Sequence, residues 1–139
     1  MSRQKMPKEI PYRNRNQTGW WVASYIERFE FYDEDKANPN RRCLAHENTI
    51  LIKAKDREQA YQKAVDLGHI SEGLEARDTD TGRSGLWRYE GLTSLLPVYD
   101  ELEDGAEIFW VEHVGRTVRK IQSRVKAKNE LEVFDDNEY

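Results

Sequence analysis

The sequence predicts an α+β fold: a four-stranded, mainly antiparallel sheet with one covering helix and an appended C-terminal helix, in the order strand, strand, helix, strand, short helix, strand. Two observations predict it. Short segments rich in β-branched and aromatic residues accompany a single strongly amphipathic segment, the pattern of a sheet covered by a helix. The 139 residues suffice for one hydrophobic core without a disulfide. The expected strands are residues 20–32, 41–54, 86–92 and 106–113.

The first two strands are expected to form a long antiparallel hairpin. In residues 20–32 the odd positions are mostly apolar, whereas the even positions change from apolar to polar at Arg28. The first half therefore reads as buried on both faces and the second half as half exposed. Such a hairpin projects beyond the helix that covers its base. Its outer aromatic residues are then either core or a docking surface: Phe29, Phe31 and Tyr32.

The covering helix is predicted to begin after Asp56. The Asp56 carboxylate can accept hydrogen bonds from N–H groups of the first turn, and Gln59 stands three residues on, as a capping box requires. Gly68 is expected to end the helix in a left-handed conformation. The apolar residues between them form one stripe, so the helix should cover a sheet: Ala60, Tyr61, Ala64, Val65 and Leu67.

The segments after the helix complete the predicted sheet. A short strand at 74–77 is an open alternative within a polar stretch. Residues 86–92 form the third strand, residues 93–102 carry leucines at helical spacing and are predicted as a short helix, and residues 106–113 form the fourth strand. The core expected from these elements consists of Trp21, Phe29, Ile50, Ile52, Tyr61, Leu67, Trp87 and Trp110.

Charge is segregated along the chain, whose formal net charge is −4. Residues 1–19 carry five basic residues and one acidic residue (+4), typical of a flexible basic arm, and residues 20–113 carry eleven basic and twenty acidic residues (−9). Residues 114–128 carry six basic residues and no acidic one (+6) on a predicted amphipathic helix, and residues 129–139 form an acidic tail (−5).

This charge pattern limits the partners. An acidic domain attracts basic macromolecules, so the expected partner is a basic protein. The helix at 114–128 is expected to dock on its own acidic domain or on a second copy, which would give a homo-oligomer. A nucleic-acid partner is not expected, because the acidic domain and the acidic tail would repel a polyanion.

Scattered aromatic and small residues carry a family resemblance. They are Trp20-Trp21-x-Ala23, Ala54, Ala60 and Ala64, Trp87-x-Tyr89-x-Gly91-Leu92, and Leu102-x-Asp104-Gly105-x-Glu107-Ile108. In this order they resemble the bacterial family called domain of unknown function 4288, over roughly residues 20–113. The resemblance implies a small α+β domain and brings no established activity with it.

Motifs of catalysis and cofactor binding are missing from the sequence. It has no glycine-rich phosphate loop, no G-x-S-x-G, no H-E-x-x-H and no pair of cysteines, so no cofactor, metal or catalytic residue is expected. Cys43 and His46 are three apart on a predicted strand and should face opposite sides. The lone cysteine fits a reducing compartment, and no apolar run approaches the roughly 20 residues of a membrane span. A cytoplasmic protein is expected.

Two function classes remain open. The favoured one is a non-catalytic bacterial protein-binding module, of the inhibitor or immunity type, whose acidic body recognises a basic macromolecular partner. The alternative is a small-molecule-binding or enzymatic domain whose aromatic residues stack a flat ligand. Candidate residues for the partner surface are Phe29, Phe31, Tyr32, Glu101, Glu103 and Asp104. Candidate residues for the alternative pocket are Trp20, Trp87, Tyr89 and Trp110.

Overall fold

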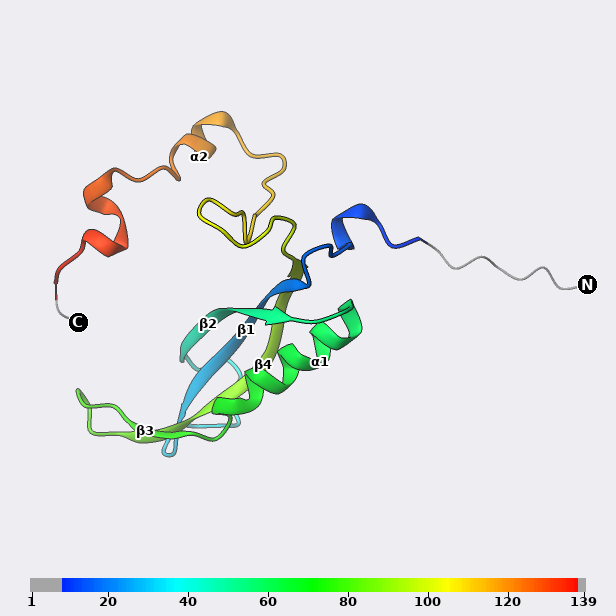
Figure 1. Ribbon diagram of the computed structural model, residues 1–139. Helices are drawn as coiled ribbons and strands as arrows, with labels where there is room; N and C mark the ends of the chain where they lie inside the picture. The colour runs from blue at the N-terminus through cyan, green and yellow to red at the C-terminus, as the bar shows by residue number, and fades with distance from the viewer. Residues whose placement is uncertain (1–8, 138–139) are drawn as a thin grey trace, which may run out of the picture. The chain divides into compact units, whose positions relative to one another are not determined.

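A computed structural model of the chain describes residues 9–137, and within them it shows a four-stranded antiparallel sheet with a helix on one face (Figure 1). The predicted α+β class is confirmed. The strands are β1 (Trp20–Phe31), β2 (Leu44–Lys53), β3 (Glu75–Arg77) and β4 (Ser84–Pro97), in the spatial order β2-β1-β4-β3. The longer helix is α1 (Arg57–Gly68) and the shorter is α2 (Val118–Gln122). Short 3-10 turns are η1 (Tyr12–Asn14), η2 (His69–Ser71), η3 (Lys128–Glu130) and η4 (Glu132–Phe134).

The chain divides into two compact units, one ending at Phe109 and the other beginning at Trp110. The sheet and α1 belong to the first unit, and α2 belongs to the second. Of the basic arm expected at 1–19, residues 1–8 lie outside the described residues. In the described part, the Tyr12 ring stacks on the Tyr99 ring at a centroid distance of 6.4 Å. None of the helices in residues 9–137 combines the length and the apolar character that a membrane span needs.

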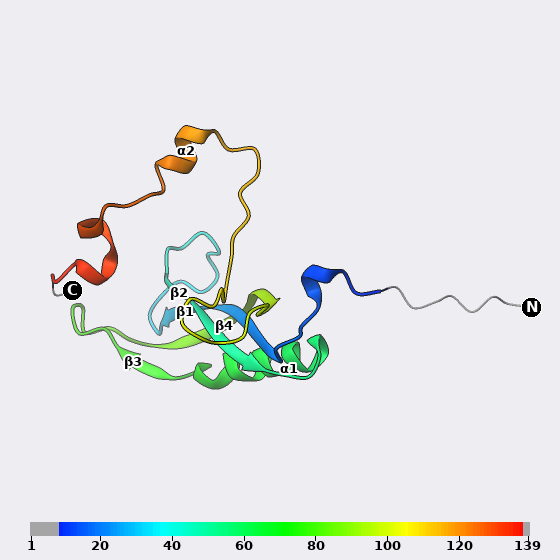
Figure 2. The same cartoon turned by 45° about the horizontal axis from the view of Figure 1, so that its top comes forward.

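Strand β1 is the centre of the sheet and pairs along its length with two neighbours. It pairs with β2 from Trp20↔Lys53 to Phe29↔Leu44 without interruption. It pairs with β4 from Trp21↔Pro97 to Phe31↔Gly85, with irregularities after Ser24 and after Ile26. The sheet is strongly curled, as Figure 2 shows for β1 and β4, because twist and bulges bend long antiparallel strands.

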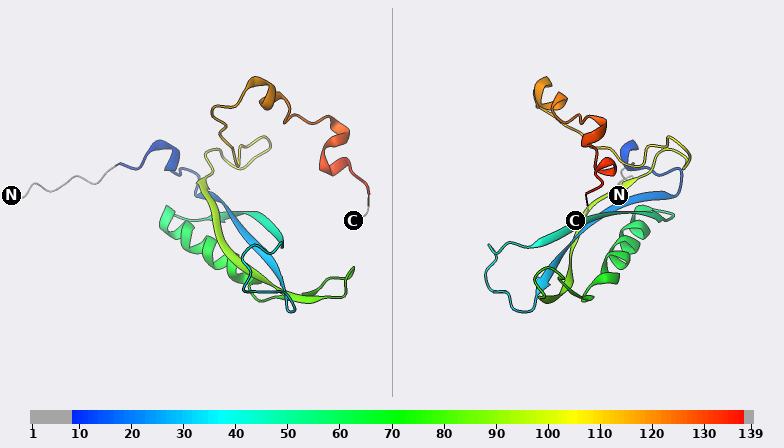
Figure 3. Two further views of the ribbon diagram at one scale, coloured as in Figure 1. Left: turned by 180° about the vertical axis from the view of Figure 1, so that it is seen from behind. Right: turned by 90° about the vertical axis from the view of Figure 1, so that its left-hand side faces the viewer.

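Helix α1 lies along one face of the sheet (Figure 3), and it packs there through small residues. Its buried positions are Ala60, Ala64 and Gly68, spaced four residues apart and therefore on one face. Small side chains let the helix approach the sheet closely. The Asp56 carboxylate accepts a hydrogen bond from the Gln59 N–H at 2.8 Å, so the predicted cap is confirmed. The core beneath the helix consists of Trp21, Ala23, Ile52, Ala54, Ala60 and Ala64.

Strand β4 corrects the predicted short helix at 93–102. The strand starts at Ser84 and continues to Pro97, and Leu95 pairs with Ala23 of β1. Leucine spacing alone does not separate a helix from a strand in so short a segment. The buried strand β1 needs a hydrogen-bonding partner on its second side, and this requirement decides the conformation.

The predicted strand at 106–113 is also wrong, since these residues form no regular structure. Both sides of β1 are occupied by β2 and β4, and the fourth strand is instead β3, the segment that the sequence left as an open alternative. Trp110, expected in the core, is 42% exposed. The order of elements is therefore strand, strand, helix, short strand, strand, followed by a short helix.

The C-terminal helix is much shorter than the predicted 114–128. Only Val118–Gln122 is α-helical, with the Thr117 hydroxyl accepting a hydrogen bond from the Lys120 N–H. No residue in 110–137 is buried. An isolated helix of this length is marginal in water, so without a packed face the remaining turns do not form.

Several other expectations about the core are corrected. Tyr61 and Leu67 are 54% and 40% exposed, because the buried stripe of α1 consists of its smaller residues. Gly68 is right-handed, with φ −62° and ψ −33°, so it does not supply the left-handed stop. Trp21, Phe29 and Ile52 are buried as predicted, whereas Ile50 and Trp87 are half-buried.

Candidate functional site

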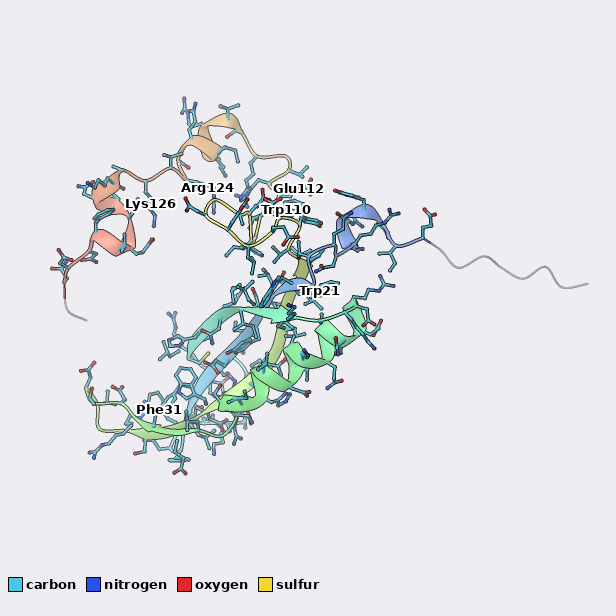
Figure 4. All side chains as sticks on the ribbon, viewed as in Figure 1. Trp21, Phe31, Trp110, Glu112, Arg124 and Lys126 are labelled. Atoms are coloured by element: carbon cyan, nitrogen blue, oxygen red, sulfur yellow. The ribbon has the colours of Figure 1, made fainter. Side chains whose placement is uncertain are left out.

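The helix-covered face of the sheet continues beyond the end of α1 into a group of large apolar side chains. Phe29 and Phe31 lie on this face because they alternate with the same period as Trp21 and Ala23. Pairing places Leu44 on one side of Phe29 and Trp87 on the other. We call Phe29, Phe31, Leu44 and Trp87 the distal aromatic cluster. Figure 4 shows Phe31 and Trp21 at opposite ends of the sheet.

The rings of this cluster hold one another in edge-to-face contacts. The Phe29 and Phe31 centroids are 5.0 Å apart with an interplanar angle of 85°, and the Phe29 and Trp87 centroids are 5.3 Å apart at 68°. The His46 ring lies 5.0 Å from the Trp87 ring. Edge-to-face pairs contribute about 0.5–1.5 kcal/mol beyond their buried area. The cluster is therefore a fixed platform.

An open groove of about 190 Å³ lies over this platform. Phe29 is buried beneath it, whereas Leu44 is 55% exposed at its side. β3 supplies Ala76 and Arg77 to the opposite wall, and Asp78 follows them. A groove of this size accommodates one or two side chains of a partner. Its lining residues are Phe29, Phe31, Leu44, Ala76, Arg77, Asp78 and Trp87.

Charged residues surround the groove. The Arg83 guanidinium lies 3.8 Å from the centroid of the Phe31 ring, and its Nη2 is 2.6 Å from Oδ1 of Asp33. Hydrogen bonding from Arg83 holds the pKa of Asp33 below its ordinary value. The Asp78 carboxylate accepts bonds from the Asp80 N–H and the Thr81 hydroxyl, and the Asp80 bond is the main cause of its lowered pKa. Within residues 9–137 no ion pair joins Asp78 to a cation.

A buried carboxylate separates the distal aromatic cluster from the core beneath α1. Glu27 is 8% exposed and accepts hydrogen bonds from Asn48 Nδ2 at 3.0 Å and from the Ser71 hydroxyl at 2.8 Å. These bonds join β1, β2 and the turn η2 at one point. A buried carboxylate without hydrogen-bond partners would be costly, and Glu27 has two. Glu27 therefore marks the boundary on this face between the distal aromatic cluster and the core beneath α1.

An ion-pair network supports the same end of the sheet. Glu30 accepts a hydrogen bond from Arg88 Nε at 2.8 Å and lies 3.5 Å from Lys36 Nζ, and the bond from Arg88 is the main cause of its lowered pKa. The Glu72 carboxylate accepts from the Tyr89 N–H and from Arg88 Nη1, and the Tyr89 bond is the main cause of its lowered pKa. Arg88 therefore links β1 to the segment that follows η2.

The structure brings together only part of the predicted partner surface. Phe29 and Phe31 are in the distal aromatic cluster, and Tyr32 is 46% exposed and donates its hydroxyl to Glu75 at 2.6 Å. The acidic residues lie at the other end of the sheet, because they follow Pro97, which pairs with Trp21. They are exposed, and in the described residues none forms an ion pair: Glu101, Glu103 and Asp104.

The three residues of the alternative pocket that belong to the first unit do not line a common pocket. Trp87 belongs to the distal aromatic cluster, and Tyr89 packs on His69 with a ring distance of 4.2 Å. Trp20 lies at the far end of β1, where the Lys53 ammonium is 5.4 Å from its ring. Trp110 belongs to the second unit.

Sequence reasoning missed four residues of the groove: Leu44, Ala76, Arg77 and Asp78. Leu44 joins Phe29 through the register of the hairpin, and the length of the loop after residue 32 hides that register in the sequence. Ala76 and Arg77 are placed by the antiparallel pairing of β3 with β4, and Asp78 follows them, with its N–H bonded to the Arg83 carbonyl. Alternation along the strand could have found Leu44 only once the pairing was known.

A larger hollow of about 490 Å³ lies at the start of α1. Most of the residues that line it are polar or charged, among them Arg15, Lys55 and Arg57 beside Asp56 and Glu58. The Trp21 indole N–H, which could serve a ligand there, already donates to the Ala54 carbonyl at 3.1 Å. Within residues 9–137 no group of His, Cys, Asp and Glu side chains is arranged to hold a metal ion. The distal aromatic cluster is thus the better candidate site.

The chain matches the model of a known protein family. The model of a protein family described as a domain of unknown function, DUF4288, matches residues 20–110. These residues contain the whole sheet, α1 and the distal aromatic cluster. No curated protein and no solved structure matches the chain.

Proposed function

The chain belongs to the DUF4288 family of domains of unknown function, and we propose that it is a non-catalytic protein-binding module. The partner is a basic protein that places an apolar side chain on the distal aromatic cluster. An inhibitor or immunity-type protein that neutralises a basic enzyme is a role of this kind. The observation that carries the proposal is the groove over the cluster, because α1 ends before it covers these four side chains.

Burial and packing support a docking role. Aromatic side chains dominate the buried centres of protein interfaces, since they give large contact areas at low cost in conformational entropy. Phe29 and Trp87 are already held by ring contacts, so a partner would meet a preorganised surface. Leu44 is 55% exposed, so a partner that covers it would bury apolar surface and gain binding free energy.

Charge supports a basic partner. Residues 20–113 carry eleven basic and twenty acidic residues, a balance of −9. Long-range attraction of this kind accelerates encounter with a positively charged protein. Asp78 lines the groove and adds a negative charge that favours a lysine or arginine beside the apolar side chain of the partner.

Affinity capture followed by titration tests the proposal. The full chain is used to capture proteins from an extract of its source cells, and the captured protein is then purified and titrated by calorimetry. We expect a basic protein whose affinity falls as salt is added. Leu44→Ser should weaken its binding by roughly tenfold or more, because the substitution removes an apolar contact at the groove.

Leu67→Ser is the matched control. Leu67 is also exposed, at 40%, but it lies on α1 outside the distal aromatic cluster. This variant should retain the affinity of the unmodified chain, and the melting midpoints of both variants show whether either substitution disturbs the fold. Equal binding by Leu44→Ser and the unmodified chain, or capture of no basic protein at all, would contradict the proposal.

A further inference from the structure

The outer edge of β2 is a long unpaired strand edge. β2 is the first strand of the order β2-β1-β4-β3, so among the residues that the structure describes only β1 pairs with it. Ten consecutive residues, Leu44–Lys53, pair with β1 without a bulge, and the strand contains neither proline nor glycine. The opposite edge strand, β3, has three residues. Long, regular edges are templates for another strand, and proteins usually interrupt them.

On the face opposite α1, this edge exposes Glu47, Thr49, Leu51 and Lys53, which alternate along the strand. Their β1 partners are Ile26, Ser24, Val22 and Trp20, which alternate with the residues beneath α1. Leu51 is 45% exposed. This face is separate from the distal aromatic cluster, so the two surfaces can be tested independently.

The edge is complementary to itself. If two copies of β2 pair in antiparallel orientation about Ile50, Glu47 of each copy stands opposite Lys53 of the other, and Thr49 stands opposite Leu51. The two-fold axis creates each of these pairs twice. Opposite charges across a strand pair are favourable, and the two Leu51 side chains become diagonal neighbours that cover each other.

We propose that the chain forms a two-fold symmetric dimer in which β2 pairs with β2 of a second copy about Ile50. The two sheets then become one continuous sheet. Backbone hydrogen bonds across residues 47–53 hold the copies together, and the Glu47–Lys53 pairs set the register. The ladder ends at Lys53, where the Lys63 ammonium already binds the Lys53 carbonyl at 2.6 Å.

Glu47 and Lys53, the two charged residues that would pair across the dimer, already make contacts on this face. The Thr93 hydroxyl donates to Oε1 of Glu47 at 3.2 Å, and the Lys53 ammonium lies 5.4 Å from the Trp20 ring. Glu47 and Lys53 are six positions apart on an extended strand, about 20 Å, so they cannot pair within one copy. Any charge coupling between them therefore reports contact between copies.

Sedimentation equilibrium of the full chain over a range of concentrations tests the dimer. We expect reversible association to twice the monomer mass of 16.4 kDa. Glu47→Lys and Lys53→Glu should each raise the dissociation constant by roughly tenfold, because each places like charges opposite each other twice. An equimolar mixture of the two variants should restore association, since one variant then presents two cations to the two anions of the other.

The double variant Glu47→Lys/Lys53→Glu should also associate as the unmodified chain does. Glu58→Lys on α1 is the matched control, because it changes the net charge as Glu47→Lys does but lies away from the edge. It should leave the dissociation constant unchanged. A chain that stays monomeric at every concentration would overturn the proposal. A dimer whose dissociation constant is unchanged by Glu47→Lys and by Lys53→Glu would also overturn it. Neither result would bear on the binding of a basic partner at the distal aromatic cluster.

Discussion

Gly68→Ala should destabilise the protein, although alanine is the better helix former. Gly68 has the right-handed conformation of an ordinary helical residue, with φ −62° and ψ −33°, so backbone strain plays no part. A Cβ added there would lie 2.5 Å from Cε2 of Tyr89, closer than two carbon atoms can approach. The Tyr89 ring has limited room to move, because it packs against His69 at 4.2 Å and Tyr25 at 6.0 Å.

The magnitude follows from two opposing effects. Replacing glycine by alanine within a helix stabilises it by about 0.5–1 kcal/mol. Forcing an extra methyl group into a packed interface costs about 1–3 kcal/mol. The two ranges combine to a net loss of about 0–2.5 kcal/mol in the free energy of unfolding at Gly68→Ala, and we expect a loss near the middle, about 1–2 kcal/mol. For a chain of this length that is a fall of roughly 4–8 °C in the melting midpoint, measured by circular dichroism.

A double-mutant cycle with Tyr89→Ala tests the reasoning. Once the Tyr89 ring is removed, Gly68→Ala should no longer clash, and it should stabilise that variant by about 0.5 kcal/mol. The change of sign distinguishes a side-chain collision from a need for left-handed backbone at Gly68. An equal loss from Gly68→Ala with and without the Tyr89 ring would refute the close packing of α1 on β4.

Three further predictions concern the core, the cap and acid stability. Ile52→Ala should lower the free energy of unfolding by about 2–5 kcal/mol in urea denaturation, because Ile52 is 2% exposed. Arg57 is exposed, so Arg57→Ala should change the free energy of unfolding by no more than about 0.5 kcal/mol. Asp56→Ala should cost about 1 kcal/mol, and an unchanged melting midpoint would contradict the observed cap. Glu30→Gln should lower the melting midpoint at pH 7, and the difference from the unmodified chain should shrink below about pH 4.5. The reason is that a carboxyl group with a lowered pKa stabilises the fold above its ordinary value of 4.5 and loses that effect as it is protonated. An equal difference at pH 3 and pH 7 would count against the Arg88 hydrogen bond as its source.

The candidate site was partly visible in the sequence. Alternation and hairpin length are local properties, and they place Phe29 and Phe31 on the outer half of the hairpin, where the sequence allows either core or a docking surface. Their grouping with Leu44 and Trp87 depends on the register of β1 with two other strands. The acidic residues from Glu101 to Asp104 were grouped with the aromatic residues by charge alone, and the direction of β4 places them at the other end of the sheet.

Local sequence determined the elements that contain their own signals. The alternation of residues 20–32 specified β1, and the Asp56 cap with the following amphipathic pattern specified α1, because these interactions join residues a few positions apart. Only the tertiary structure decided which segments complete the sheet. Residues 93–97 became strand and residues 106–113 did not, because the two free sides of β1 can each accept one partner. The buried face of α1 was likewise decided by contact, since the sheet accepts Ala60, Ala64 and Gly68 at close distance and leaves the larger Tyr61 and Leu67 in solvent.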